Sequence, residues 1–216
     1  MTRSIRIDLF TDIVCPWCLI GTARLDQALA GLDKDVQVEI FHHPFLLDPT
    51  TPESGQNTRE RLKEKYGGDI EAMQARVEAA ARDAGVALDM KVQPMSYPTV
   101  KPHTLIRAAA PGQQYGLAKA FAAAYFLEGK NITDDAILAD IAVDHGFDRA
   151  EALALVNNQG ELDTTKALAV SASQQGINGV PFFIFNNQFA ISGGQPPEVF
   201  ARAFRVALGE EALTQG

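Results

Sequence analysis

The stretch Asp12-Ile13-Val14-Cys15-Pro16-Trp17-Cys18 contains both cysteines of the 216-residue chain, and its surroundings decide the fold. Residues 4–10 alternate between apolar and polar side chains, which predicts a strand, and residues 16–32 gather apolar side chains at helical spacing. Pro16 suits the first position of this helix, where its missing N–H costs nothing. The two thiols therefore stand where a strand gives way to a helix, close enough to join in a disulfide.

The place of each thiol on the expected helix predicts its role. Cys15 faces the unpaired backbone N–H groups and the positive end of the helix dipole, which favour a thiolate and hence a nucleophile. Cys18 lies one turn further in, so we expect it to be more buried and to stay protonated until it resolves a mixed disulfide. A lone Cys-x-x-Cys is also half of a zinc site, or two incidental core residues. Zinc needs two more ligands, and no second pair or His-x-x-x-His occurs, so we expect no metal.

Further along the chain, β-type and helical patterns alternate in an order that predicts an α/β fold. A second strand over 36–41 completes a strand–helix–strand unit that is typical of a parallel sheet. The strand signal returns late, at 180–185 and 189–192, joined by a tight Asn186-Asn187 turn and followed by a helix over 196–208. Between them no strand is predicted over 50–160, and helices are expected at 57–66, 69–84, 103–110, 113–128, 134–145, 148–157 and 161–175. The sequence thus predicts one α/β domain, residues 1–48 and 161–216, interrupted by a helical domain over 49–160.

Composition and charge narrow the function classes. The chain has 27 acidic and 19 basic residues, a net charge of −8, and no basic stripe of the kind that binds phosphates, so we expect no nucleic-acid partner. No apolar run approaches the roughly 20 residues needed to cross a bilayer, which argues against a membrane partner. The first residues lack the apolar core of a secretory signal, so a cytoplasmic location is expected. Oligomeric state is left open by these patterns.

Several ordered motifs resemble those of one family. The Cys15-Pro16-Trp17-Cys18 strand end and Gly179-Val180-Pro181 resemble the thioredoxin superfamily, and the helical block between them resembles its DsbA-like branch. The likeness extends to the FrnE-type cytosolic oxidoreductases. Its further motifs are Lys65-Tyr66-Gly67, Ala124-Tyr125-Phe126-Leu127-Glu128-Gly129, Gly176-Ile177-Asn178 and Ser192-Gly193-Gly194-Gln195-Pro196. The resemblance implies a thioredoxin-like fold with an inserted all-helical domain and a thiol–disulfide oxidoreductase activity.

The resemblance also implies roles for individual residues. It implies a cis peptide bond before Pro181, which exposes the backbone of Val180 to an extended substrate beside the cysteines. Trp17 either covers the surface that meets partner thiols or packs on its own helix. His103 aligns with a family segment, which implies that it lines the substrate cleft, although residues 96–104 depart from the family pattern around it. The alternative is that His103 is a structural hydrogen-bonding residue at a helix start. Because the redox-active disulfide carries the chemistry, the resemblance implies no other cofactor. Glutathione or another small thiol is the expected co-substrate. The expected partners are protein or small-molecule thiols and disulfides.

Two positions near the cysteines leave the route of a proton open. Thioredoxins bury an acid six residues before the first cysteine, and Leu9 occupies that position here. Asp12 either caps the turn before the helix or accepts a proton when Cys18 reacts. Proton transfer from Cys18 therefore needs a route other than the familiar acid.

Two other functions compete with disulfide exchange. Kappa-class glutathione transferases and hydroxychromene-carboxylate isomerases are similar in fold and insertion, and they use glutathione on small molecules. They place Ser where Cys15 stands and lack the second thiol, so the paired cysteines argue against this function. A non-enzymatic binding module could also use the same disulfide as a redox switch.

Overall fold

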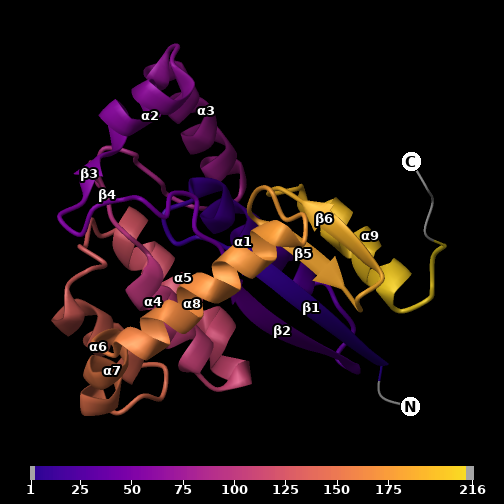
Figure 1. The fold of residues 1–216 in the computed structure, drawn as a ribbon. Helices are drawn as coiled ribbons and strands as arrows, with labels where there is room; N and C mark the ends of the chain where they lie inside the picture. Colours follow the sequence, from indigo (N-terminus) through magenta and orange to yellow (C-terminus); the bar gives the residue numbers. More distant parts are fainter. Residues whose placement is uncertain (1–2, 213–216) are drawn as a thin grey trace.

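The computed structural model describes residues 3–212, and its centre is a mixed sheet of four strands in the order β2-β1-β5-β6. The first two strands run parallel and are joined by a helix, which confirms the predicted strand–helix–strand unit. The late strands come from the other end of the chain and pair antiparallel (Figure 1). These elements are β1 (Arg3–Thr11), α1 (Pro16–Leu29), β2 (Val36–Pro44), β5 (Phe182–Phe185), β6 (Phe189–Ser192) and α9 (Pro197–Ala207).

The turn between β5 and β6 follows the sequence prediction. Asn186 and Asn187 have φ values of 49° and 55°, so both adopt the left-handed conformation that a two-residue hairpin turn requires. Asn tolerates this conformation better than most residues because its short amide can bond locally. The Asn186 Oδ1 atom accepts a hydrogen bond from the backbone N–H of Arg6 at 2.8 Å, which ties the turn to β1.

Helices make up most of the chain between β2 and β5, as predicted, with two exceptions. Two short antiparallel strands, two residues each, pair Gln56 with Ser96 where only loops and helices were expected. Strands of this length are too short to show alternation in the sequence. The fourth helix also begins at Val100 instead of residue 103. The elements are β3 (Gln56–Asn57), α2 (Thr58–Tyr66), α3 (Ile70–Asp83), β4 (Met95–Ser96), α4 (Val100–Ala108), α5 (Pro111–Phe126), α6 (Asp135–Val143), α7 (Arg149–Val156) and α8 (Gln159–Gln174).

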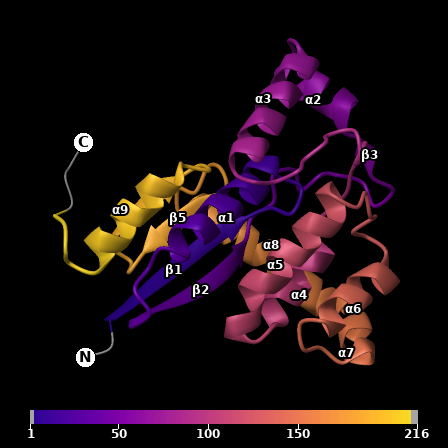
Figure 2. The same ribbon diagram turned by 180° about the vertical axis from the view of Figure 1, so that it is seen from behind.

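Helices cover both faces of the sheet. Helices α1 and α9 cover one face (Figure 2). On this face Phe183 and Phe185 join an apolar core with Phe200 and Phe204. Helix α8 crosses the opposite face (Figure 1). Phe182 on that face packs in a smaller cluster with Ala172 of α8. The alternation of β5 side chains between these faces explains its continuous run of apolar residues. Among residues 3–212, every helix is too short or too polar to cross a membrane.

The helices of the middle block share a core with the start of α1. Ile13, Leu19 and Ile20 belong to the same buried cluster as Phe121 of α5 and Leu138 of α6. Helix α8 contacts both β2 and α4, so it joins the sheet to the block. The division into residues 1–48 with 161–216 and residues 49–160 stays a prediction.

Candidate functional site

The site begins where β1 ends and α1 starts. Cys15 is the N-cap residue of α1 in an extended conformation, and Pro16 takes the first helical turn. The backbone N–H of Cys15 donates to the carbonyl of Asp12 at 3.1 Å, and the carbonyl of Cys15 accepts from the N–H of Cys18 at 3.0 Å. Trp17 lies between the cysteines with 40% of its surface exposed. This local geometry places the Cys15 sulfur at the helix N-terminus, as the sequence predicted.

The two thiols face different surroundings. Both cysteines are free thiols, and each has 4% of its surface exposed. Cys18 is therefore not more buried than Cys15 by exposed surface, although the sequence predicted that it would be. The Cys15 thiol lines a cleft and donates to the carbonyl of Val180 at 3.6 Å. Cys18 points inward, and burial, together with the neighbouring Cys15, raises its pKa well above the ordinary thiol value. The inner thiol is therefore protonated at neutral pH, in line with the resolving role expected for it.

The loop before β5 lies directly against the start of α1. The Val180–Pro181 peptide bond is cis, and the carbonyl of Pro181 accepts from the N–H of Gly193 at 2.8 Å. A Cβ atom added at Gly21 would stand 2.8 Å from the Pro181 ring and 3.2 Å from the Cα of Gly194. Only glycine at these positions allows the loop to come this close to the helix.

A cleft of about 490 Å³ opens beside Cys15. Cys15, Pro16, Trp17 and Val180 line it, so the structure brings these predicted residues together, and Pro181 follows directly after Val180. The opposite wall comes from α2, α3 and the segment after β2, which sequence reasoning did not assign to the site. Among these side chains Lys65 belongs to a motif named above, Lys65-Tyr66-Gly67, but that motif did not assign it to the site, and the tertiary fold brings all of them to the cysteines. They include Phe45, Leu47, Arg61, Leu62, Lys65, Met73, Val77 and Met90.

The basic wall of the cleft is anchored by one carboxylate. Asp48 accepts hydrogen bonds from Arg61 Nε at 2.9 Å and from Thr50 Oγ1 at 2.6 Å. Burial acts to raise the pKa of Asp48, but the hydrogen bonds from Thr50 and Arg61 together outweigh it and hold the pKa below the ordinary value. Asp48 therefore stays ionised and fixes α2, through Arg61, against the loop after β2. Lys65 stands on the same helix, with its ammonium 5.3 Å from the Tyr66 ring centre.

His103 lies away from the cleft in which the resemblance placed it. It is 1% exposed, and its ring faces Asp12 and His42 behind the cysteines. A side chain buried in this way cannot contact a substrate held in the cleft. The expected substrate-binding role of His103 thus finds no support in its position.

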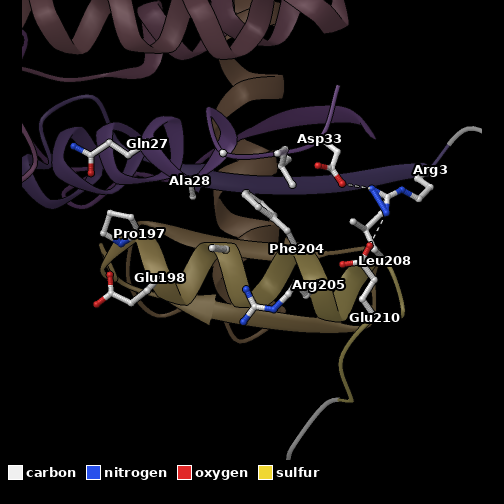
Figure 3. A pocket seen from close by; sticks show the side chains of 13 residues that line it. Arg3, Gln27, Ala28, Asp33, Pro197, Glu198, Phe204, Arg205, Leu208 and Glu210 are labelled. Carbon is white, nitrogen blue, oxygen red and sulfur yellow. Dashed lines mark hydrogen bonds and ion pairs between the residues drawn. The ribbon is translucent and has the colours of Figure 1, made fainter. Parts of the chain in front are cut away.

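Another hollow, of about 390 Å³, lies between α9 and the far end of α1 (Figure 3). Figure 3 shows Arg3 between Asp33 and Glu210, and its guanidinium lies 3.0 Å and 2.6 Å from their carboxylates. Arg3 offsets part of the negative charge at this end of the hollow. The lining contains neither a thiol nor an imidazole. In residues 3–212 no group of three or more His, Cys, Asp or Glu side chains is arranged to hold a metal ion.

Comparison with known proteins agrees with this fold. Residues 6–205 match the model of the DSBA-like thioredoxin domain, so the chain belongs to that family. It is 32% identical to a probable DsbA oxidoreductase from Streptomyces coelicolor, whose crystal structure superposes with a TM-score of 0.83, covering 98% of this chain and 93% of that one. The uncharacterized protein YwbO of Bacillus subtilis is 27% identical over 93% of this chain and 96% of its own length.

More distant structures share the fold. The cytosolic disulfide reductase DsbM from Pseudomonas aeruginosa, solved with GSH, is 15% identical with a TM-score of 0.66, covering 94% of this chain and 99% of that one. A 2-hydroxychromene-2-carboxylate isomerase is also 15% identical, with a TM-score of 0.72, covering 96% and 100%. Both confirm the thioredoxin-like fold with its helical insertion. At this identity the likeness extends to the fold alone.

Proposed function

We propose that this protein is a thiol–disulfide oxidoreductase in which Cys15 is the nucleophile and Cys18 the resolving thiol. The observation that carries the proposal is the position of Cys15 at the N-terminus of α1, with its sulfur facing the cleft and 3.6 Å from the Val180 carbonyl. A thiolate at this place can attack a disulfide held in the cleft. The proposal also assigns the protein to the FrnE-type oxidoreductases within its family.

The reaction proceeds in two exchanges. The Cys15 thiolate attacks one sulfur of the substrate disulfide, forms a mixed disulfide and releases the first substrate thiolate. Cys18 then loses its proton and attacks the Cys15 sulfur, which releases the second thiolate and leaves the Cys15–Cys18 disulfide. The substrate gains two electrons and the cysteine pair loses them. As an oxidase the enzyme runs the same steps in reverse.

The lining of the cleft supports thiol and disulfide substrates with an apolar part. Pro16 and Trp17 border it on one side, and the Val180 backbone offers hydrogen-bonding groups to an extended chain. Lys65 adds a positive charge that suits an anionic substrate or co-substrate. We also propose that glutathione, or another small thiol, is the co-substrate that reduces the Cys15–Cys18 disulfide back to the dithiol. A cytoplasmic location, where such thiols are abundant, is part of the same proposal.

The competing functions predict different chemistry at Cys18. A glutathione transferase or isomerase of the kappa or hydroxychromene-carboxylate type needs no resolving thiol, whereas this chain carries one behind the nucleophile. A redox-sensing module would cycle its disulfide without turning over substrate. Turnover that depends on both cysteines therefore separates the proposal from its alternatives.

Insulin reduction provides the test. The native protein with a thiol reductant should reduce insulin disulfides, and Cys15→Ser should lose this activity to background. The matched variant Cys18→Ser should keep the first exchange and accumulate a mixed disulfide on Cys15, visible by mass spectrometry. A native protein without turnover, together with a Cys18→Ser variant that traps nothing, would contradict the proposal. Titration of the pair in glutathione buffers then sets the direction, because the reduction potential decides between reductase and oxidase.

A further inference from the structure

A buried polar cluster of Asp12, His42 and His103 lies behind the cysteines. Asp12 follows β1 and is 2% exposed, His42 belongs to β2 and is 5% exposed, and His103 belongs to α4 and is 1% exposed. The Asp12 Oδ1 and His103 Nε2 atoms lie 3.5 Å apart, and the two imidazole rings stack with centres 5.8 Å apart. Three elements thus bring titratable groups together in the interior, where such groups are rarely placed without a partner or a task.

The hydrogen bonding of this cluster is incomplete. One Asp12 oxygen, Oδ2, accepts from the backbone N–H of Leu47 at 2.8 Å. Within residues 3–212, the other oxygen and both ring nitrogens of His103 are buried without a hydrogen bond to another protein group. Each unpaired buried polar group destabilises the fold, so several of them in one place point to a functional role. A carboxylate oxygen with free lone pairs is able to take up a proton.

A small hollow lies between Cys18 and two members of this cluster, Asp12 and His42. It measures about 10 Å³, and Cys18, Thr11, Asp12 and His42 are among the residues that line it. This volume is about that of one water molecule, and the lining offers the polar groups that such a water needs. A single water in this space would link Cys18 to Asp12, because both residues line it. Leu9, at the position where thioredoxins carry their acid, is fully buried and has no group to offer.

The other ionisable groups around this space are already engaged. On α5, Lys119 pairs with Asp26, and Tyr115 donates to the same carboxylate at 2.8 Å. The hydroxyl of Tyr125, also on α5, donates to the carbonyl of Met95 at 2.8 Å. The Nε2 atom of His42 is hydrogen-bonded to the Thr11 hydroxyl at 2.6 Å. Burial lowers the pKa of His42 well below its ordinary value, and the nearby His103 and His43 lower it further. The titratable groups that line the space are Cys18 of α1, Asp12 after β1, His42 of β2, and Tyr115 and Lys119 of α5. Cys15, His103 and Tyr125 lie outside this lining, and each interacts with Cys18 or Asp12.

We propose that Asp12, oriented by His103, accepts the proton of Cys18 when this thiol resolves the mixed disulfide. The inference rests on the proposed oxidoreductase function. In the step, the S–H bond of Cys18 breaks and its proton passes through one water to Asp12 Oδ1. The sulfur electron pair of Cys18 then forms the bond to Cys15, and the bond from Cys15 to the substrate sulfur breaks. His103 is a positioning residue, because it acts on Cys18 only through Asp12.

The aromatic disulfide dithiobis(nitrobenzoate) separates the two exchanges. Each exchange releases one coloured nitrothiophenolate, so the reduced protein should give a first phase from Cys15 and a second phase from Cys18. We expect Asp12→Asn to leave the first rate within about twofold and to slow the second about 100-fold near pH 6, since general-base catalysis contributes about 100-fold or more. The loss should shrink as pH rises, because hydroxide replaces the missing acceptor, and native and variant rates should converge at alkaline pH.

Matched variants distinguish proton transfer from a loss of structure. Asp8 is another buried carboxylate of β1 but bonds Arg6 and His43 instead, so Asp8→Asn should keep both phases. His103→Gln should slow the second phase with the same convergence, and it serves as the test if Asp12→Asn does not fold; His43→Gln is its control. An unchanged second phase, or a deficit that is equal at every pH, would overturn the inference. Absence of both phases in the native protein would instead overturn the proposed function.

Discussion

At the scale of single residues, the two thiols of one motif are separated in chemistry by the direction in which they point. Cys15 faces the cleft and the Val180 carbonyl, while Cys18 faces the interior and the space beside Asp12. Burial penalises a thiolate inside the protein, whereas the helix N-terminus favours one at its tip. The same turn of helix can therefore hold a nucleophilic thiolate and a protonated resolving thiol.

This separation predicts the alkylation behaviour of Cys18. In the Cys15→Ser variant, the rate at which iodoacetamide modifies Cys18 should keep rising about tenfold per pH unit beyond pH 9. The reason is that the raised pKa of Cys18 lets the thiolate form only at higher pH. An ordinary thiol levels off after its pKa of about 8.5. The rate is followed by mass spectrometry over a pH series, with the denatured variant as the control.

The shape of this pH profile decides the outcome. Poor access to a buried thiol would lower the rate by the same factor at every pH and leave the plateau in place. Only a raised pKa moves the plateau to higher pH. A plateau near neutral pH would therefore contradict the assignment of Cys18 as the protonated, resolving thiol.

At the scale of elements, the site depends on how closely the Pro181 loop and the Gly193-Gly194 turn approach α1. The guanidinium of Arg24 donates to the Gly194 carbonyl at 2.6 Å, and the carbonyl of Trp17 lies 3.1 Å from a Cβ built at Gly194. Neither Gly21 nor Gly194 has room for a larger residue, because the Pro181 ring opposes Gly21 and the backbone of α1 opposes Gly194. The spacing between helix and loop thus sets where the Val180 carbonyl stands relative to Cys15.

Gly21→Ala tests this close approach. The added methyl group would lie 2.8 Å from the Pro181 ring, so helix and loop must separate, and overpacking of this kind costs about 1–3 kcal/mol. We expect the urea midpoint to fall and the first-exchange rate of Cys15 to drop, since the Val180 carbonyl moves with the loop. Gly112→Ala in α5 is the matched control, because nothing lies within 4 Å of its added atom. Equal stability and equal rates in both variants would show that the contact is not limiting.

At the scale of the whole molecule, the sequence predicted what local signals encode. The Cys15-Pro16-Trp17-Cys18 junction, the βαβ unit and the Asn186-Asn187 turn follow from short-range patterns, and the structure contains them. The apolar wall of the cleft and the contact between Asp12 and His103 join segments far apart in the chain. Such pairs carry no local signature, because any buried residue on those helices would show the same periodicity. The role expected for His103 came from a motif, while its position came from how α4 packs behind α1.

The shared core leads to a last prediction, about unfolding. Ile13, just before α1, and Leu19 and Ile20 in its first turns are buried with Phe121 and Leu138 of the helical block. An apolar interface of this kind couples the two parts, so we expect one cooperative transition in urea, although the chain order suggests two domains. Trp17, the only tryptophan, reports on the thioredoxin-like part by fluorescence, while far-ultraviolet circular dichroism reports mainly on the helices of the block. The two curves should coincide in the fully reduced protein.

Ile20→Ala, which removes apolar contacts from the interface, should shift both midpoints together, with Val170→Ala on the exposed face of α8 as its control. Separate transitions in the native protein would instead show that the helical block folds on its own and that the cleft between the two parts can open without unfolding either.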